Sequence, residues 1–393
     1  MNFKHKLMSN NFEKKDFKSV INLFNKKNPI LTQSKSVEKF EQNWSKWLGV
    51  KHSVFVNSGS SANFLSIFIL KEMVGSGEII VPSLTWVSDI TSVILNGFKP
   101  VFVDINPNNL GMNDEQVLKK VNKNTKAVFI THVLGLNALS QKLLNELKRK
   151  KIILIEDVCE SHGATFKNKK LGTFGLISNF SFYYAHHMST IEGGMISTND
   201  TKIYQMTRMI RSHGMLREVG SNNQQTIYKK KYKNLNSDFI FMLPGFNMRN
   251  NEIGGLIGIS QLKRLDSNNN KRKKNYTFFL KNLDSEKFKT DFDIKGSCNY
   301  ALTLVMKNKN HKKRKKLELA MKRNNIEFRK GMAGGGNQLM QPYLKKYINK
   351  FKINDFKEVN HIHHFGYYIG NYPSLNISKI KKICSILNNI SLK

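Results

Sequence analysis

Between residues 53 and 198 the chain alternates short, apolar, β-branched runs with longer stretches of helical character. The runs are Ser53-Val54-Phe55-Val56, Ile79-Ile80-Val81, Val101-Phe102-Val103, Ala127-Val128-Phe129-Ile130, Ile152-Ile153-Leu154-Ile155 and Asn179 to Tyr184. Runs of this kind are typical of strands buried on both faces, and the helices between them supply parallel crossovers. The pattern therefore predicts an α/β fold with a mostly parallel central sheet.

Polar residues follow these runs where ligands of such sheets bind, beyond the carboxyl ends of the strands. They are Asn57-Ser58-Gly59-Ser60-Ser61, Thr85-Trp86, Asp104, His132, Asp157 and His186. Ser60 and Ser61 precede an apolar stretch from Phe64 to Met73, so we expect them at a helix N-terminus, where phosphate binds readily. Simple helix capping is the alternative for this turn.

The rest of the chain predicts a second unit. After Gly245 a helical stretch runs toward Phe279, and an α+β region follows over residues 285–393. We divide the chain into a large domain, residues 1–266, which includes the N-terminal segment, and a small C-terminal domain, residues 267–393.

Charge and cysteine content limit the possible partners. The net charge of +36 is attractive to phosphates, but the basic runs are scattered and lack interleaved aromatic residues, so we predict a solvated surface and no nucleic-acid partner. No segment has the roughly 18 apolar residues of a membrane span, and we expect a cytoplasmic protein. Cys159, Cys298 and Cys384 are widely spaced, which argues against a cysteine-ligated metal. We predict no metal site.

A series of motifs in a fixed order carries a resemblance to a known family. They are Val37-Glu38-Lys39-Phe40-Glu41, Asn57 to Asn63, Pro82-Ser83-Leu84-Thr85-Trp86, Ile155-Glu156-Asp157, Gly172-Thr173-Phe174-Gly175, Ser181-Phe182, Glu192-Gly193-Gly194, Gly245 to Arg249 and Ile257 to Leu262. Over nearly its whole length the chain resembles the DegT/DnrJ/EryC1/StrS family of sugar aminotransferase-like proteins. The resemblance implies the type I, aspartate-aminotransferase-like fold of pyridoxal-phosphate-dependent transferases.

One position departs from the common pattern of that family. Its Schiff-base lysine stands five residues after the serine of the Ser-Phe pair, and counting from Ser181 reaches His186. The nearest lysines, Lys170 and Lys202, lie outside the motif. An imidazole moves protons but forms no stable Schiff base. The change resembles the sugar-nucleotide 3-dehydratase branch, whose members use pyridoxamine phosphate to remove the C3 hydroxyl of a 4-keto-6-deoxyhexose.

The resemblance leaves several activities open. One dehydratase type acts on a CDP-4-keto-6-deoxyglucose and carries a cysteine-ligated [2Fe-2S] centre, whereas the GDP-4-keto-6-deoxymannose type has no cluster and uses glutamate as amino donor. The cysteine count favours the second type, in the biosynthesis of a dideoxysugar such as those of lipopolysaccharide O-antigens. An aminotransferase working without its lysine and a non-catalytic sugar-nucleotide-binding homologue are the alternatives.

The resemblance also assigns roles around the expected cofactor, which would be pyridoxal or pyridoxamine phosphate held without a covalent bond. His186 would be the acid–base catalyst. Asp157 would pair with the protonated pyridine nitrogen, with helix capping as its alternative role. Trp86 would stack on the pyridine ring. Glu160 stands where the family usually has a glutamine near the 3-hydroxyl, and an acid there could hold a proton.

The remaining roles concern the phosphate and the substrate. Ser60, Ser61 and Ser181 would bind the cofactor phosphate. Asn247 matches an asparagine that reaches the phosphate site of a neighbouring subunit, which implies a homodimer with shared active sites. The nucleotide-sugar substrate would be bound by residues that resemble sugar-binding positions: His213, Arg217, Glu327 and Arg329. For His213 and Arg217, surface structure is the alternative role.

Overall fold

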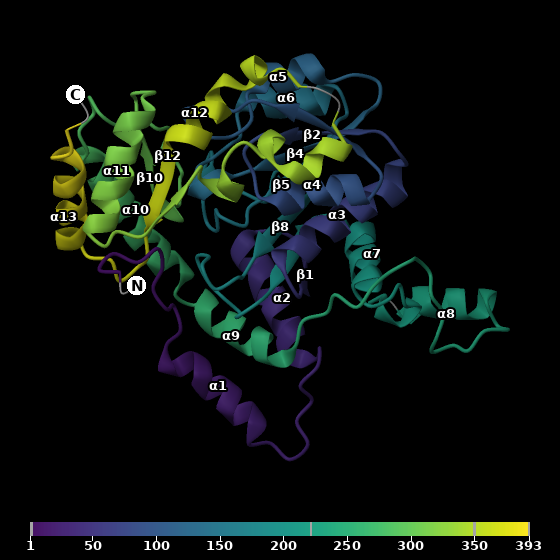
Figure 1. The fold of residues 1–393 in the computed structure, drawn as a ribbon. Coiled ribbons are helices and arrows are strands. Elements are labelled where there is room, and N and C mark those ends of the chain that lie inside the picture. Colours follow the sequence, from purple (N-terminus) through teal and green to yellow (C-terminus); the bar gives the residue numbers. More distant parts are fainter. Residues whose placement is uncertain (1–2, 221, 349–350, 392–393) are drawn as a thin grey trace.

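The computed structural model describes residues 3–220, 222–348 and 351–391, and its centre is a seven-stranded sheet of order β1-β9-β8-β5-β4-β2-β3 (Figure 1). Every neighbouring pair from β8 to β3 is parallel, and β9 runs antiparallel to both β1 and β8. The strands are β1 (His52–Val56), β2 (Glu78–Pro82), β3 (Lys99–Val103), β4 (Thr125–Thr131), β5 (Ile153–Asp157), β8 (Ile177–Ser181) and β9 (Gly194–Thr198).

The predicted fold class is confirmed, and each of the six predicted runs overlaps a strand. Alternate side chains of the strands enter two separate hydrophobic clusters, so the sheet is buried on both faces. In β4, for example, Phe129 belongs to one cluster while Val128 and Ile130 belong to the other. The apolar runs do not predict β9, a short strand that begins at the second of two adjacent glycines, Gly193 and Gly194.

Helices pack on both faces of this sheet. Helix α3 contacts β8 and β9, whereas α2 packs beside β1 and α9 and buries Phe40 and Trp44 in the second cluster. None of the helices in the described ranges is long and apolar enough to cross a membrane. The helices up to residue 262 are α1 (Lys14–Phe24), α2 (Lys35–Leu48), α3 (Gly59–Val74), α4 (Val87–Leu95), α5 (Asp114–Lys120), α6 (Gln141–Arg149), α7 (Thr201–Arg211), α8 (Asn222–Lys231) and α9 (Glu252–Leu262).

The helical stretch expected from Gly245 to Phe279 is two helices. Residues before Asn251 are extended, and the Asn251 side chain caps α9 by accepting a hydrogen bond from the Gly254 amide (3.0 Å). Helix α9 ends at Leu262, and α10 (Leu265–Asn282) begins three residues later. Apolar spacing alone did not locate this break, because Ile259, Leu262 and Leu265 keep a helical spacing across it.

A second, three-stranded antiparallel sheet lies beside the first, with α10 and α13 packed together against it (Figure 1). The strand order of this sheet is β10-β12-β11. The N-terminal segment contacts this unit, because the His5 amide donates a hydrogen bond to the Asn325 carbonyl (3.1 Å). A division at residues 266 and 267 would fall near the start of α10, and we retain it as a proposal. The elements are β10 (Ala301–Val305), α11 (His311–Arg323), β11 (Phe328–Lys330), α12 (Lys357–Phe365), β12 (Gly366–Gly370) and α13 (Ile377–Asn388), with a small hairpin of β6 (Thr165–Phe166) and β7 (Lys169–Lys170) in the first unit.

Candidate active site

The candidate site forms at the carboxyl edge of the central sheet. Thr131 ends β4 and is paired in register with Asp157, which ends the neighbouring strand β5. Ser181 ends β8, the next strand along, and Thr85 follows β2. Parallel strands bring their carboxyl ends to the same edge, so residues far apart in the sequence converge here.

Asp157 is buried and held by two N–H groups. Its Oδ1 accepts a hydrogen bond from the Cys159 amide (2.8 Å), and its Oδ2 accepts one from Asn63 Nδ2 (2.9 Å). Asn63 comes from α3 and is itself fully buried. Asn63 lies in one of the sequence motifs, but no role is predicted for it there. Nothing in the spacing of the motifs shows which carboxylate its side chain contacts.

The first turn of α3 is a candidate anion site. Ser58 caps the helix through Oγ, which accepts from the Ser61 amide (3.0 Å). Across the described residues, the amides of Gly59 and Ser60 have no protein acceptor. A Cβ atom at Gly59 would lie 2.5 Å from Ser181 Cβ, so glycine allows the end of β8 to approach this turn. Ser61 and Ser181 thus come together with free amides at a helix N-terminus.

His186 belongs to a group of buried and partly buried aromatic side chains near Asp157. Its ring centroid lies 6.2 Å from that of His162 and 5.6 Å from that of Tyr300. Burial lowers the pKa of His186 to about 4, opposed by the negative charge of Asp157. The imidazole is therefore neutral near pH 7. Its Nδ1 is buried and has no hydrogen-bond partner among the described residues, so it can accept a proton.

The neighbouring histidine has a different environment. His187 Nε2 lies 2.9 Å from the Cys298 carbonyl oxygen, and its side chain is buried. Burial lowers the pKa of His187 well below its ordinary value. A neutral ring that donates to a backbone carbonyl has a packing role. Among the described residues, Nδ1 of His187 and both ring nitrogens of His162 also lack partners, so the position of His186 in the sequence motif, and not a free nitrogen alone, distinguishes it.

Glu160 is held at the other side of this group. The Leu134 amide donates to its Oε2 (2.8 Å), and burial raises the pKa of Glu160 to about 7. Tyr300 and Tyr368 lie close enough for the charge of Glu160 to contribute to their raised pKa values, which result mainly from burial. A carboxyl with a pKa near 7 exchanges a proton readily at neutral pH, as an acid beside a cofactor hydroxyl would need to do.

Trp86 and the glycine-rich segment, residues 331–336, border the site. Trp86 precedes α4, and 55% of its surface is exposed, so the indole is available to a ligand. A Cβ atom at Gly334 would lie 2.2 Å from the Thr85 carbonyl oxygen, and Gly334 has a φ of +56°. Glycine at position 334 thus lets the second unit pack directly against the strand end that carries Thr85.

The predicted substrate residues fall into two groups. His213, Arg217 and Asn247 lie in one loop region: the His213 amide donates to the Phe246 carbonyl (3.0 Å), and the Arg217 guanidinium lies 5.9 Å from the Phe239 ring centroid. Within this chain the contacts of these residues are with that region, and Asn247 is exposed. Their roles stay predictions.

Glu327 and Arg329 lie on the second unit. Glu327 Oε2 accepts from the Leu7 amide (2.9 Å), so this carboxylate holds the N-terminal segment. Arg329 is 59% exposed and pairs across strands with Tyr368, whose phenol is close to Glu160. Arg329 is therefore better placed than Glu327 to meet a ligand, although both assignments stay predictions.

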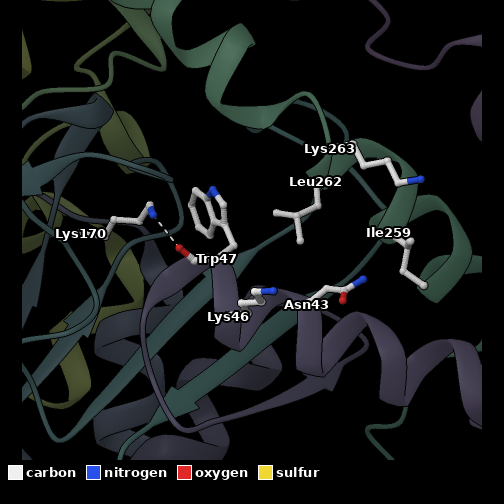
Figure 2. Close-up of a pocket in the computed structure, with 7 residues that line it drawn as sticks. All are labelled: Asn43, Lys46, Trp47, Lys170, Ile259, Leu262 and Lys263. Atoms are coloured by element: carbon white, nitrogen blue, oxygen red, sulfur yellow. Dashed lines mark hydrogen bonds between the residues drawn. The ribbon is translucent and has the colours of Figure 1, made fainter.

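A hollow of about 460 Å³ lies apart from this site, between α2 and α9 (Figure 2). Figure 2 shows Lys170 there, with its ammonium group donating to the Trp47 carbonyl (2.6 Å). Lys202, in the first turn of α7, is exposed. The two lysines nearest His186 in the sequence thus have other environments. Among the described residues no group of three or more His, Cys, Asp or Glu side chains could hold a metal ion.

The fold and the site define a class of protein: an α/β, aminotransferase-type protein with free amides at a helix N-terminus and a buried carboxylate at the sheet edge. Residues 11–388 match the DegT/DnrJ/EryC1/StrS aminotransferase family, and the chain belongs to that family. It is 33% identical over 372 residues to GDP-4-keto-6-deoxy-D-mannose 3-dehydratase of Escherichia coli O55:H7, covering 93% of this chain and 95% of that protein.

Solved structures show the same similarity. A structure of the E. coli GDP-4-keto-6-deoxy-D-mannose 3-dehydratase with bound hydrated PLP has a TM-score of 0.90 and 31% identity, covering 98% of this chain and 100% of the other. A second structure of a GDP-4-keto-6-deoxymannose 3-dehydratase, with a trapped PLP-glutamate geminal diamine, has a TM-score of 0.87 at 31% identity and covers the same shares of the two chains. The expected aspartate-aminotransferase-like fold is confirmed.

Proposed function

We propose that this chain is a 3-dehydratase of a nucleotide-linked 4-keto-6-deoxyhexose, with GDP-4-keto-6-deoxymannose as substrate, pyridoxamine phosphate as cofactor and glutamate as amino donor. The observation that carries the proposal is a partly buried, neutral His186, with an unpartnered Nδ1, at the position where the family has its lysine. The similar dehydratases with bound PLP and with a PLP-glutamate adduct support the choice of cofactor and donor. We assign the activity to cytoplasmic dideoxysugar biosynthesis.

The residues of the site fit this cofactor. The free amides of Gly59 and Ser60, with the Ser61 and Ser181 hydroxyls, would bind the phosphate. Asp157 would accept a hydrogen bond from the protonated pyridine nitrogen, and Trp86 is exposed to cover the ring. Glu160 would meet the 3-hydroxyl, with its proton available near neutral pH. When bound, the cofactor supplies the amine that condenses with the C4 ketone and the electron sink for C3 deoxygenation.

His186 would perform the proton transfers. As a neutral imidazole it would take a proton from C4′ of the cofactor and deliver one to the departing C3 hydroxyl. The phosphate and diphosphate of the ligands bring negative charge, which favours the protonated imidazole once the proton has been taken. A lysine at this position would instead compete for a covalent bond to C4′. Histidine therefore favours loss of the hydroxyl over transfer of nitrogen.

We also propose a homodimer with shared sites. Asn247 is exposed and has its contacts within its own loop, as expected for a side chain that reaches a second subunit. Helix α1 projects from the body in Figure 1, and it carries the exposed apolar side chains Phe17, Ile21 and Phe24. Phe246, beside Asn247, is also exposed. Such surfaces are typical of subunit contacts. Sedimentation equilibrium should give twice the chain mass, and a monomer with full activity would contradict this assembly.

The product of the reaction tests the function. Purified protein loaded with pyridoxamine phosphate is mixed with GDP-4-keto-6-deoxymannose and glutamate, and the nucleotide sugar is analysed by mass spectrometry. We expect a product lighter than the substrate by one oxygen atom, with release of ammonia. A product that keeps nitrogen at C4 would indicate an aminotransferase, and no turnover with any nucleotide carrier, CDP included, would indicate a non-catalytic binding protein. His186→Asn, which lacks the proposed acid–base group, is the matched control and should form no deoxygenated product.

A further inference from the structure

A second carboxyl is buried beside Asp157. Asp89 stands in the first turn of α4 and is fully buried. Asn63 Nδ2 donates both to Asp89 Oδ1 (2.6 Å) and to Asp157 Oδ2 (2.9 Å). One amide nitrogen therefore joins the two carboxyls. No role is predicted for Asp89 from the sequence, because a single acid in an apolar helix forms no recognisable motif with other residues.

The contacts of the other Asp89 oxygen require an extra proton. Asp89 Oδ2, Thr85 Oγ1 and Thr131 Oγ1 form a triangle in which every pair of oxygens is within hydrogen-bonding distance: Thr131 to Asp89 at 2.6 Å, Thr85 to Thr131 at 2.8 Å, and Thr85 to Asp89. The two hydroxyls supply two protons for three contacts. A proton on Asp89 would complete all three hydrogen bonds.

The charges around Asp89 favour the same state. The titratable groups that face it are Asp157 at the end of β5, Cys159 just beyond that strand, and Tyr343, which follows the glycine-rich segment. Each of these three groups is neutral when protonated and negative when deprotonated, so none of them is a cation. Burial, followed by the charge of Asp157, raises the pKa of Asp89 well above its ordinary value. Like charges sharing a buried site do not both ionise.

We propose that Asp89 is a positioning residue that stays protonated and, through Asn63, fixes Asp157 in the orientation in which it meets the pyridine nitrogen. The proposal rests on the function given above, because it assumes the cofactor at Asp157. The pair of carboxyls then carries one negative charge, which matches the one positive charge of a pyridinium. Asp89 itself does not touch the cofactor.

The test compares an isosteric neutral residue with an apolar one. Asp89→Asn keeps an acceptor for Asn63 and a donor for the threonine oxygens, whereas Asp89→Leu removes both. Calorimetric titration with pyridoxamine phosphate should give an unchanged Kd for Asp89→Asn and a Kd raised about tenfold or more for Asp89→Leu, as expected when a hydrogen bond to a charged group is lost. The absorbance of bound pyridoxal phosphate should shift in Asp89→Leu alone.

Unfolding of the apo-protein provides a second readout. A carboxyl whose folded pKa is raised loses stability as pH increases above its unfolded value of 3.8. The fall in the urea midpoint between pH 5 and pH 8 should therefore be smaller in Asp89→Asn than in the wild type. If Asp89→Leu does not fold, Thr131→Val replaces it, because it breaks the same triangle.

Three results would overturn the inference: Asp89→Asn weakening the cofactor as much as Asp89→Leu, wild-type affinity in Asp89→Leu, or equal pH dependence of unfolding in the wild type and Asp89→Asn. Equal weakening in Asp89→Asn and Asp89→Leu would mean that Asp89 acts through a negative charge. Wild-type affinity in Asp89→Leu would mean that Asp89 only packs in the core. Failure of the wild type to bind pyridoxamine phosphate would instead contradict the proposed function, so the two failures are distinguishable.

Discussion

Replacement of Glu160 by glutamine tests the electrostatics of the site without removing its hydrogen bond. The glutamine Oε1 can still accept from the Leu134 amide, as Glu160 does at 2.8 Å. The change removes only the ability to ionise. Because burial raises the pKa of Glu160 to about 7, the folded state disfavours its negative charge, whereas the unfolded chain ionises it near 4.5.

The magnitude follows from these two pKa values. Below pH 4.5 the carboxyl is neutral in both states, and stability is lost as pH rises through the folded value near 7. One pKa unit corresponds to about 1.4 kcal/mol, so the wild type should lose about 3 kcal/mol relative to Glu160→Gln over this window. Partial exposure of Glu160 makes this figure an upper value.

Urea unfolding of both apo-proteins at pH 5 and pH 8, at one protein concentration, measures the effect. Other titrating groups, Asp89 included, are present in both proteins and cancel in the difference. Glu160→Gln should gain stability over the wild type on going from pH 5 to pH 8. A difference between the two proteins that is the same at both pH values would refute the raised pKa and the assignment of Glu160 as a proton holder.

The other predictions concern His186 and the phosphate. His186→Asn should lower kcat by about a hundredfold or more with unchanged pyridoxamine phosphate affinity, measured by turnover and calorimetry, and unaltered turnover would eliminate the proposed base. His186→Lys should form a covalent bond to pyridoxal phosphate, seen as an absorbance band and a borohydride-stable mass increase; failure to form it would contradict the position of the side chain. Ser181→Ala should weaken pyridoxamine phosphate at least about tenfold while leaving unphosphorylated pyridoxamine unaffected, and equal losses for both ligands would remove Ser181 from the phosphate site.

The sequence predicted the central sheet well because its strands are buried on both faces and appear as continuous apolar runs. Asp157, Ser181 and His186 could be located because each directly ends or follows such a run. The sequence pattern could not show which side chains hydrogen-bond to one another. Asn63 and Asp89 lie on two different helices and meet Asp157 only through tertiary packing.

The roles expected of Glu327, Asn247 and Arg217 also depend on contacts that local sequence does not determine. Glu327 matched a sugar-binding position, yet its carboxylate is already engaged by the Leu7 amide, a contact separated by 320 residues. Asn247 and Arg217 depend on what a second subunit and a nucleotide would contribute, and neither is determined by local sequence pattern. Loop residues of this kind are positioned by their partners.

The central claim is that the imidazole of His186 exchanges a proton with C4′ of a cofactor held without a covalent bond. Enzyme loaded with pyridoxamine phosphate carrying two deuterium atoms at C4′ is mixed with the keto sugar, and the recovered cofactor is analysed by mass spectrometry. The account predicts loss of one deuterium in the wild type and retention of both in His186→Asn. Equal loss of deuterium in the two proteins would contradict it.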